Sequence, residues 1–371
     1  MNSGRPGSRR TPKFRQIGNW VDEAVRNGEL QPGDRLPSEN EFVALLGMSR
    51  VTVRRGIEEL EKAGRIRTVR GSGSFLRNVS APADVPDREK TGQFAVVSTY
   101  VDGYIFPSTI RGIEEVLSEN GCTVQISFTN NNSNRERKIL RKLLSKDDID
   151  GLIAEPSCGT MPSRNLELYQ EFLKRGIPVL FFNAIFPAFE GKYPLVSLDD
   201  RAVGRHAAEL LMEAGHRKIG GLFKLDDVQG MLRFEGFQDA LLSAGLELDN
   251  RRVIWFDSYG GRHLSDRMDE IMNRLKGCTA VQCYNDEIAC AFEDLVIKRG
   301  LKVPDDLSIV SVDDASISGM VPVPLTTFPH PKEELGRKAA EIIMRMADTR
   351  EFKGGQLYDP KPVMRASIRQ M

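Results

Sequence analysis

The sequence predicts an α/β protein made of two parts, and three observations support this prediction. Residues 34–75 combine two short helical patterns, a turn and two short strands. From Phe94 onward, apolar strand-like runs alternate with helical runs that mostly end at a glycine, which is typical of βαβ units in doubly wound parallel sheets. Between these parts, residues 79–92 hold prolines, small residues and charges, a composition typical of a linker.

The predicted domain order follows from these observations. Residues 1–11 are rich in Gly, Arg and Ser and predict a disordered basic tail. Residues 12–78 form a winged helix-turn-helix domain, the linker covers 79–92, and residues 93–371 form a two-lobed domain of doubly wound parallel sheets. About 280 residues are too many for a typical single core, so two sheets are expected rather than one.

The smaller domain begins with a helix whose apolar stripe is Phe14, Ile17, Val21 and Val25. Ser38 precedes Glu41 by three residues, the spacing of a capping box, and the helix that starts there ends at Gly47. Ser49 is a second N-cap, and the helix after it closes at Gly64. The apolar stripe of this second helix is Val53, Ile57 and Leu60.

The second helix carries arginines outside its apolar stripe. Arg50 and Arg54 lie near Thr52 at its N-terminal end, a face that can reach phosphates and base edges in a major groove. Strands at 66–69 and 74–76 flank a turn at 70–73 that can bring Arg70 to the sugar-phosphate backbone. For each arginine taken alone, a solvated basic surface is the alternative interpretation.

These stretches resemble the winged helix-turn-helix of the GntR regulators. The pattern of that family is G-x-x-L-P-S-E, then S-R-x-T-V-R, then G-x-G, and residues 33–39 (GDRLPSE), 49–54 (SRVTVR) and 71–73 (GSG) are similar to it. The resemblance implies that DNA is the partner of this domain. The residues that it assigns to DNA binding are Lys13, Arg35, Glu39, Ser49, Arg50, Thr52, Arg54, Arg70 and Gly71.

Charge and cysteine content are consistent with a nucleic-acid partner at one end of a cytoplasmic protein. The net charge is zero, but residues 1–80 hold 15 Lys and Arg against 9 Asp and Glu, so a polyanion is expected at that end. The five cysteines lack CxxC spacing, which predicts reduced thiols and no metal site. No signal-peptide pattern and no apolar run of about 20 residues is apparent, so no membrane association is expected.

The larger domain is predicted to alternate strands and helices along its length. Strands are expected at 94–100, 123–128, 151–155, 178–182, 218–223, 253–256, 279–284 and 307–312. Helices are expected at 109–120, 135–146, 166–175, 201–214, 229–244, 264–276, 286–299 and 332–346.

Open parallel sheets bind ligands at the carboxyl ends of their strands. The residues just after the predicted strands are Tyr100, Asp102, Glu155, Lys224, Asp226, Asp227, Gln229, Asn285, Asp286, Asp313, Asp314, Phe328 and His330. Carboxylates and amides beside aromatic faces suit a hydroxyl-rich sugar, although Asp and Asn after a strand are often only helix caps. Arg233, one turn into its helix, can pair with these carboxylates or donate forked bonds to a ligand.

This part of the chain resembles the effector domain of the LacI/GalR repressors and the type I periplasmic sugar-binding proteins. The similar stretches are 112–121 (GIEEVLSENG), 233–237 (RFEGF), 283–289 (CYNDEIA), 303–310 (VPDDLSIV) with 313–314 (DD), and 325–327 (LTT) before 331–336 (PKEELG). The resemblance implies sugar binding at Arg233, Asn285 and Asp313. The family has Gly-Tyr before the two aspartates where this chain has Ser311-Val312, which puts the orientation of Asp313 in doubt.

A GntR-type domain joined to a LacI-type domain resembles, in particular, the arabinose-responsive repressors of sugar-utilisation operons. Residues 12–14 (PKF), 223–230 (FKLDDVQG), 283–287 (CYNDE) and 330–332 (HPK) are similar to that group. The resemblance implies L-arabinose as effector. The implied effector-binding residues are Tyr100, Glu155, Lys224, Asp227, Gln229, Arg233, Asn285, Asp286, Asp313 and His330.

The resulting hypothesis is a homodimeric repressor that binds operator DNA, needs no cofactor, and is released when a sugar closes its effector domain. Another sugar as effector, or activation in place of repression, stays open. Two other classes are less well supported: a regulator with an aminotransferase-like domain using pyridoxal phosphate, for which no matching lysine context is present, and a transport component.

Overall fold

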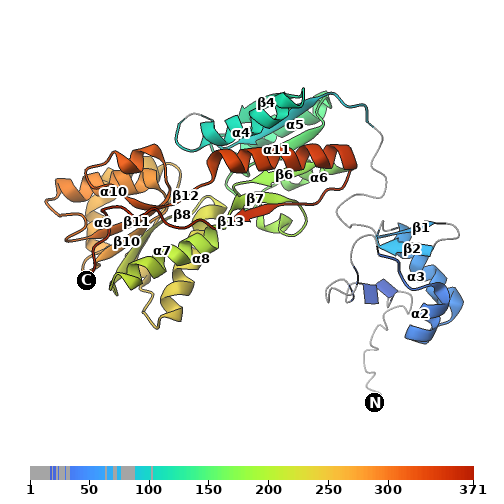
Figure 1. The fold of residues 1–371 in the computed structure, drawn as a ribbon, viewed down its shortest axis with the longest axis horizontal. Coiled ribbons are helices and arrows are strands. Elements are labelled where there is room, and N and C mark those ends of the chain that lie inside the picture. Colours follow the sequence, from blue (N-terminus) through green and yellow to red (C-terminus); the bar gives the residue numbers. More distant parts are fainter. Residues whose placement is uncertain are drawn as a thin grey trace, which may run out of the picture. The chain divides into compact units, whose positions relative to one another are not determined.

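The computed structural model describes residues 17–18, 20–21, 24, 30, 34–62, 65–69, 73–76, 88–101 and 103–371. The chain divides into two compact units, Met1–Asp87 and Arg88–Met371 (Figure 1). No helix in the described part of the chain is both long enough and apolar enough to cross a membrane.

The smaller unit contains the predicted helix-turn-helix and wing. Helix α2 (Glu39–Leu46) starts at a complete capping box, in which the Ser38 amide donates to Glu41 Oε2 at 2.7 Å, and it ends at Gly47 in the left-handed region. Helix α3 (Arg50–Lys62) follows, and strands β1 (Ile66–Val69) and β2 (Gly73–Leu76) pair antiparallel. These elements confirm the predicted order.

A small apolar core holds the elements of this unit together. Ile17 and Val21 are helical and fully buried, and they belong to the same core as Phe42, Val53, Ile57, Leu60, Ile66 and Leu76. Three residues that the sequence analysis assigned to these helices lie outside the described residues: Phe14, Val25 and Gly64. Trp20 meets the edge of Phe42, with ring centroids 5.3 Å apart.

The larger unit contains two parallel sheets, and the first belongs to what we term the N-terminal lobe. Its strand order is β13-β7-β6-β5-β3-β4. The strands are β3 (Gln93–Ser98), β4 (Thr123–Phe128), β5 (Gly151–Ala154), β6 (Val179–Phe182), β7 (Leu195–Leu198) and β13 (Gln356–Tyr358). The flanking helices are α4 (Phe106–Glu119), α5 (Ser133–Lys146), α6 (Leu166–Lys174) and α11 (Lys332–Thr349). Strands β5 and β6 are buried throughout, as expected for parallel strands covered on both faces.

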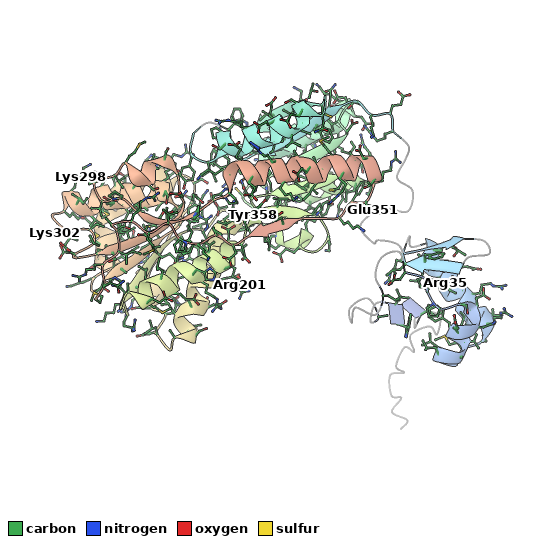
Figure 2. All side chains as sticks on the ribbon, viewed as in Figure 1. Arg35, Arg201, Lys298, Lys302, Glu351 and Tyr358 are labelled. Atoms are coloured by element: carbon green, nitrogen blue, oxygen red, sulfur yellow. The ribbon has the colours of Figure 1, made fainter. Side chains whose placement is uncertain are left out.

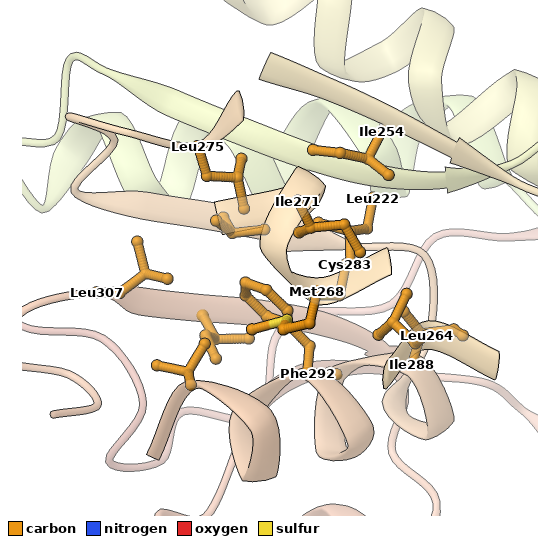
Figure 3. Close-up of a cluster of buried hydrophobic side chains, with 14 of the residues drawn as sticks. Leu222, Ile254, Leu264, Met268, Ile271, Leu275, Cys283, Ile288, Phe292 and Leu307 are labelled. Carbon is orange, nitrogen blue, oxygen red and sulfur yellow. The ribbon is translucent and has the colours of Figure 1, made fainter. Parts of the chain in front are cut away.

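The second sheet forms the C-terminal lobe, in the order β12-β11-β10-β8-β9. Its strands are β8 (Ile219–Lys224), β9 (Val253–Phe256), β10 (Ala280–Cys283), β11 (Ser308–Asp313) and β12 (Thr326–Pro329). Its α-helices are α7 (Asp200–Glu213), α8 (Val228–Ser243), α9 (Met268–Arg274) and α10 (Asp286–Lys298). Figure 3 shows part of the core, where Ile271 and Phe292 pack with strand residues Leu222 and Ile254.

The chain passes between the lobes three times. It leaves the N-terminal lobe after β7 and enters α7, and it returns from β12 into α11, which lies along the first sheet (Figure 1). After β13 it crosses again, because Val363 pairs with Thr327 and the amide of Ile309 donates to the Ser367 carbonyl at 2.8 Å. These three crossing segments, after β7, β12 and β13, connect the two lobes and form a hinge between them.

The structure differs from the expected elements in two ways. The helix expected at 264–276 is a 3₁₀ segment (Gly260–Arg267) followed by the short α9, with a kink at His263. Strands β7, β12 and β13 were absent from the expected strands. They have four, four and three residues, and each lies next to a crossing between the lobes, where pairing within the sheet decides the conformation more than composition does.

Residues 88–92, which the sequence assigned to the linker, are bonded to the larger unit. Arg88 donates to Asp147 Oδ1 at 2.7 Å, and the Thr91 amide donates to Asp150 at 2.9 Å. The larger unit therefore begins before the first strand, at Arg88. Polar contacts hold residues 88–92 to the larger unit. The pattern of apolar residues in the sequence does not reveal such contacts.

Candidate effector site and DNA-binding surface

A cavity of about 530 Å³ lies between the two lobes at the carboxyl ends of their strands. Nine of the ten predicted effector-binding residues line it: Tyr100, Glu155, Lys224, Asp227, Gln229, Arg233, Asn285, Asp313 and His330. The remaining wall includes Tyr104, Phe106, Asn131, Asn183, Asp200, Phe256, Ser258, Arg262 and Tyr284. The structure thus brings together side chains from both sheets.

Arg233 is the centre of the polar wall. Its side chain is 4% exposed, and it donates from Nε to Asp200 Oδ1 at 2.7 Å and from Nη2 to Asp313 Oδ1 at 3.4 Å. Nη1 donates to the Tyr284 carbonyl at 2.6 Å, and the guanidinium lies 4.9 Å from the Tyr284 ring centroid. A buried cation is thereby compensated by two carboxylates.

Two glycines explain how Arg233 and Asp200 meet. Gly204 in α7 lies against the backbone of α8, where an added Cβ would be 2.1 Å from the Arg233 carbonyl oxygen. Gly236 in α8 lies equally close to the Arg201 carbonyl of α7, at 2.0 Å from an added Cβ. The helices pack backbone to backbone, which brings the start of α7 within reach of Arg233.

Tyr104 reaches from the N-terminal lobe into the opposite wall. Its hydroxyl donates to Asp313 Oδ2 and accepts from the Asp286 amide at 3.1 Å. Tyr104 has φ of +54°, in the left-handed region, a sparsely populated conformation that non-glycine residues usually adopt only at special positions. This residue was missed from the sequence because it lies in a loop before α4 and not directly after a strand.

Lys224 and Asp227 form a second charged group in the wall. Lys224 Nζ lies 3.0 Å from Asp227 Oδ2, and Tyr284 donates its hydroxyl to the same oxygen at 2.6 Å. Burial lowers the pKa of the Lys224 ammonium, but the carboxylates of Asp227 and Asp226 offset this and raise the pKa overall. Lys224 is therefore a firmly charged part of the wall.

On the N-terminal side, Glu155 is held by four donors. It accepts bonds from the Thr99 amide at 2.8 Å and from Asn183 Nδ2 at 3.0 Å, and also from the hydroxyls of Thr99 and Ser98. The Asn183 Oδ1 atom is buried and has no hydrogen bond within the described residues. It is therefore available to a ligand donor in the cavity.

Burial changes the protonation of two groups in the wall. The pKa of Asp200 is raised to about 6 by burial, an effect that Arg233 partly offsets. Burial lowers the pKa of His330 to about 4, so its ring is neutral at pH 7. Nδ1 of His330 is buried and unbonded among the described residues, which leaves a neutral imidazole for a ligand hydroxyl.

Some sequence-predicted residues have other positions. Asp286 is fully buried outside the cavity wall, where its carboxylate accepts from the Ala315 amide and the Thr327 hydroxyl, each at 2.7 Å. Asp314 pairs with Arg365 at 2.6 Å, and Phe328 lies in the core. Asp102 lies outside the described residues. No group of three or more His, Cys, Asp or Glu in the described segments is arranged to hold a metal ion.

The smaller unit presents charged and hydroxyl side chains on α3 and at its start. Arg50 and Arg54 are 64% and 62% exposed at the side chain, and both pair with Glu39, at 3.3 and 3.1 Å. The hydrogen bonds from Arg54 are the first cause of the lowered pKa of Glu39. The hydroxyls of Ser49 and Thr52 bond each other at 2.8 Å at the start of the helix.

A further predicted residue lies before α2 and pairs with the wing. The exposed Arg35 (labelled in Figure 2) forms a bridge with Phe75, and its Nε would lie 2.8 Å from a Cβ added at Gly73, which has φ of +108°. The positive φ favours glycine at this position. The predicted residues Lys13, Arg70 and Gly71 lie outside the described residues.

Comparisons with known proteins match both units. Residues 14–76 match the model of the bacterial regulatory proteins of the gntR family, and residues 199–368 match that of the periplasmic binding protein-like domain. The fold of the transcriptional regulator CelR in its cellobiose complex is similar, with a TM-score of 0.68 and 21% identity over 90% of this chain and all of that one. The regulator CcpA of Lactococcus lactis has a TM-score of 0.65 and 24% identity over 76% of this chain and all of its own.

Two curated relatives match the whole chain. The arabinose metabolism transcriptional repressor of Halalkalibacterium halodurans is 33% identical over 363 residues, covering 96% of both chains. The repressor of the same name from Geobacillus stearothermophilus is 33% identical over 368 residues, covering 97% of this chain and 98% of its own. The chain therefore belongs to the family of these bacterial transcriptional repressors, in which a gntR-type DNA-binding domain is joined to a periplasmic-binding-protein-like domain.

Proposed function

We propose that this repressor binds operator DNA in the cytoplasm as a homodimer and is released by a neutral sugar, with L-arabinose as the first candidate. The observation that carries the proposal is Arg233, buried at the cavity wall between Asp200 and Asp313. Such a fixed fork of donors and acceptors suits vicinal hydroxyls. The names of the two full-length relatives support arabinose, and membership of a regulator family supports a regulator rather than an enzyme.

The charge of the cavity favours an unphosphorylated ligand. Its wall holds six carboxylates, from Glu155, Asp200, Asp227, Asp257, Glu287 and Asp313, against three cations, from Lys224, Arg233 and Arg262. A phosphate would meet an excess of negative charge in a partly desolvated site. Tyr100, Phe106 and Phe256 supply apolar surface for the face of a sugar ring.

Sugar binding must favour the conformation that holds DNA weakly, because a ligand with equal affinity for both conformations shifts nothing. A 100-fold loss of operator affinity requires a coupling of about 2.7 kcal/mol. On DNA, Arg50, Thr52 and Arg54 would contact bases or phosphates in the major groove. The two arginines would leave the exposed pairs that they form with Glu39.

Isothermal titration calorimetry against a panel of pentoses, hexoses and a pentose 5-phosphate tests the effector. We expect L-arabinose to bind and the phosphate ester not to bind. Gln229→Ala, in the cavity wall, should weaken binding at least tenfold, whereas Gln238→Ala on the same helix but outside the wall should not. Tight binding of the phosphate ester with no binding of any free sugar would overturn the proposed effector class.

The face formed by α4 and β4 is our candidate dimer contact. It has a hollow lined by Val101, Pro107, Ile110, Arg111, Glu114, Ile126 and Phe128, and β4 is the edge strand of its sheet. Ile126 and Phe128 are 41% and 37% exposed, and opposite charges on one face allow self-complementary pairing. In sedimentation analysis, Ile126→Asp should yield monomers. The control Leu242→Asp, at an exposed site on α8, should remain dimeric. A dimeric Ile126→Asp variant would mean that the dimer contact lies elsewhere.

A further inference from the structure

A set of contacts joins the two lobes beside the cavity rather than across it. The N-terminal lobe contributes Asn131, Gly159 and Thr160, and the C-terminal lobe contributes Leu225, Asp226, Val228 and Ser258. Only Asn131 and Ser258 of this set line the cavity. The other five residues lie outside the cavity wall, and Gly159 and Thr160 among them carry no charge that could act on the effector.

The amide of Asn131 is oriented by its own lobe. Its Oδ1 accepts from the Cys158 amide at 2.7 Å, so the Nδ2 group must point away, and it donates to Asp226 Oδ2 at 3.1 Å and Ser258 Oγ at 2.9 Å. The Ser258 amide donates to the same Asp226 oxygen at 2.9 Å. Both ends of this bridge are thus fixed before the lobes meet.

Thr160 and Gly159 extend the contact along one edge. The Thr160 hydroxyl donates to the Leu225 carbonyl at 2.8 Å. Gly159 lies so close to the start of α8 that an added Cβ would be 2.8 Å from Val228 Cγ2. Val228 is buried and β-branched, so its side chain cannot rotate away easily. The lobes can approach this closely only because Gly159 has no side chain.

We propose that these residues form an interlobe clasp that holds the effector domain closed and sets the rate at which the effector leaves. The effector lies between the lobes, so its exit requires them to separate, and separation breaks the clasp. Entry also requires the lobes to be apart, so a weaker clasp cannot slow association. This inference rests on the proposed function in taking a sugar as the effector.

Two variants outside the cavity test the clasp in the full-length protein. Thr160→Val removes one cross-lobe hydrogen bond, and Gly159→Ala places a methyl against Val228. In stopped-flow measurements with L-arabinose, each should raise the dissociation rate about fivefold or more, and the association rate should not fall below that of the unmodified protein. Equal dissociation rates in all proteins would overturn the clasp.

Matched controls separate the clasp from general destabilisation. Thr349→Val removes a hydroxyl bond of the same 2.8 Å length, to the Arg345 carbonyl within one lobe, and Gly319→Ala adds a methyl where nothing lies within 4 Å. Both controls should leave the dissociation rate unchanged. A similar acceleration in the controls would assign the effect to loss of stability and overturn the inference.

Hydrogen exchange without sugar gives a readout that does not depend on the effector's identity. Peptides covering 157–160 and 225–228 should exchange faster in Thr160→Val than in Thr349→Val, because the lobes separate more often. If no sugar binds the unmodified protein, the proposed function fails while this comparison still decides the clasp. Unchanged exchange in both peptides would overturn it.

Discussion

Arg54 on α3 and Arg233 on α8 both pair with carboxylates, but their surroundings are opposite. Arg54 is 62% exposed and shares Glu39 with Arg50, whereas Arg233 is 4% exposed between Asp200 and Asp313. In water an ion pair contributes little and can exchange partners; away from water, removing one partner leaves an uncompensated charge. The exposed cluster is therefore suited to releasing its arginines to DNA, and the buried one to keeping a fixed geometry for a ligand.

The largest effect is expected at the buried cluster. Arg233→Met leaves two carboxylates without their cation in a closed site, which should cost about 3–5 kcal/mol of unfolding free energy. Urea unfolding of the full chain measures this loss, and Arg54→Met serves as the exposed control with no change in midpoint. Equal stability of the two variants would mean that the buried carboxylates are compensated by protons, and the comparison would fail.

A second effect concerns pH. The folded-state pKa of His330 is lowered from 6.5 to about 4, so its contribution to stability is present above pH 6.5 and is lost as the pH falls through 4, by roughly 3 kcal/mol in total. Asp200 acts in the opposite sense: its raised pKa of about 6 gives stability that is present below 3.8 and lost as the pH rises through 6.

His330→Gln isolates the first of these contributions. Between pH 7 and pH 4.5 the variant should lose less unfolding free energy than the unmodified protein in urea titrations. Parallel stability profiles for the two proteins would show that His330 is not held neutral by burial.

The smallest effect on stability, and a clear one on binding, is expected at the exposed cluster. Arg54→Ala should leave the thermal midpoint unchanged but weaken binding to a random-sequence duplex. The slope of log K against log salt should fall in magnitude by about 1, the value for one lost phosphate contact. Fluorescence anisotropy at several salt concentrations measures it. An unchanged slope would mean that Glu39 keeps Arg54 even in the presence of DNA.

The sequence predicted helices and strands better than it predicted which residues contact each other. Expected strands at 123–128 and 253–256 have the observed bounds of β4 and β9, because runs rich in β-branched and aromatic residues between polar neighbours are local signals. Strands β7, β12 and β13 escaped detection, and they precede the three crossings between lobes. Short strands next to a crossing owe their conformation to pairing partners more than to their own composition.

In the candidate site too, a local rule placed some residues correctly and failed for others. Nine residues after strands or early in helices were placed in the cavity wall by the rule for parallel sheets. Asp286, chosen by the same rule, faces the Ala315 amide and the Thr327 hydroxyl instead. Tyr104 was not chosen, because no local pattern shows that a loop residue reaches an aspartate 209 positions later in the chain.

By itself, the sequence determined the α/β class, the two-part organisation, the capped helices of the smaller unit and the family, because caps, periodicity and motifs are properties of neighbouring residues. The tertiary structure decided what depends on distant ones. Gly204 and Gly236 look like helix-weakening residues until α7 and α8 are seen in backbone contact. The Arg233 cluster and the Thr160–Leu225 bond likewise exist only because two sheets are joined by three crossings, and no local pattern encodes the meeting of residues so far apart in the chain.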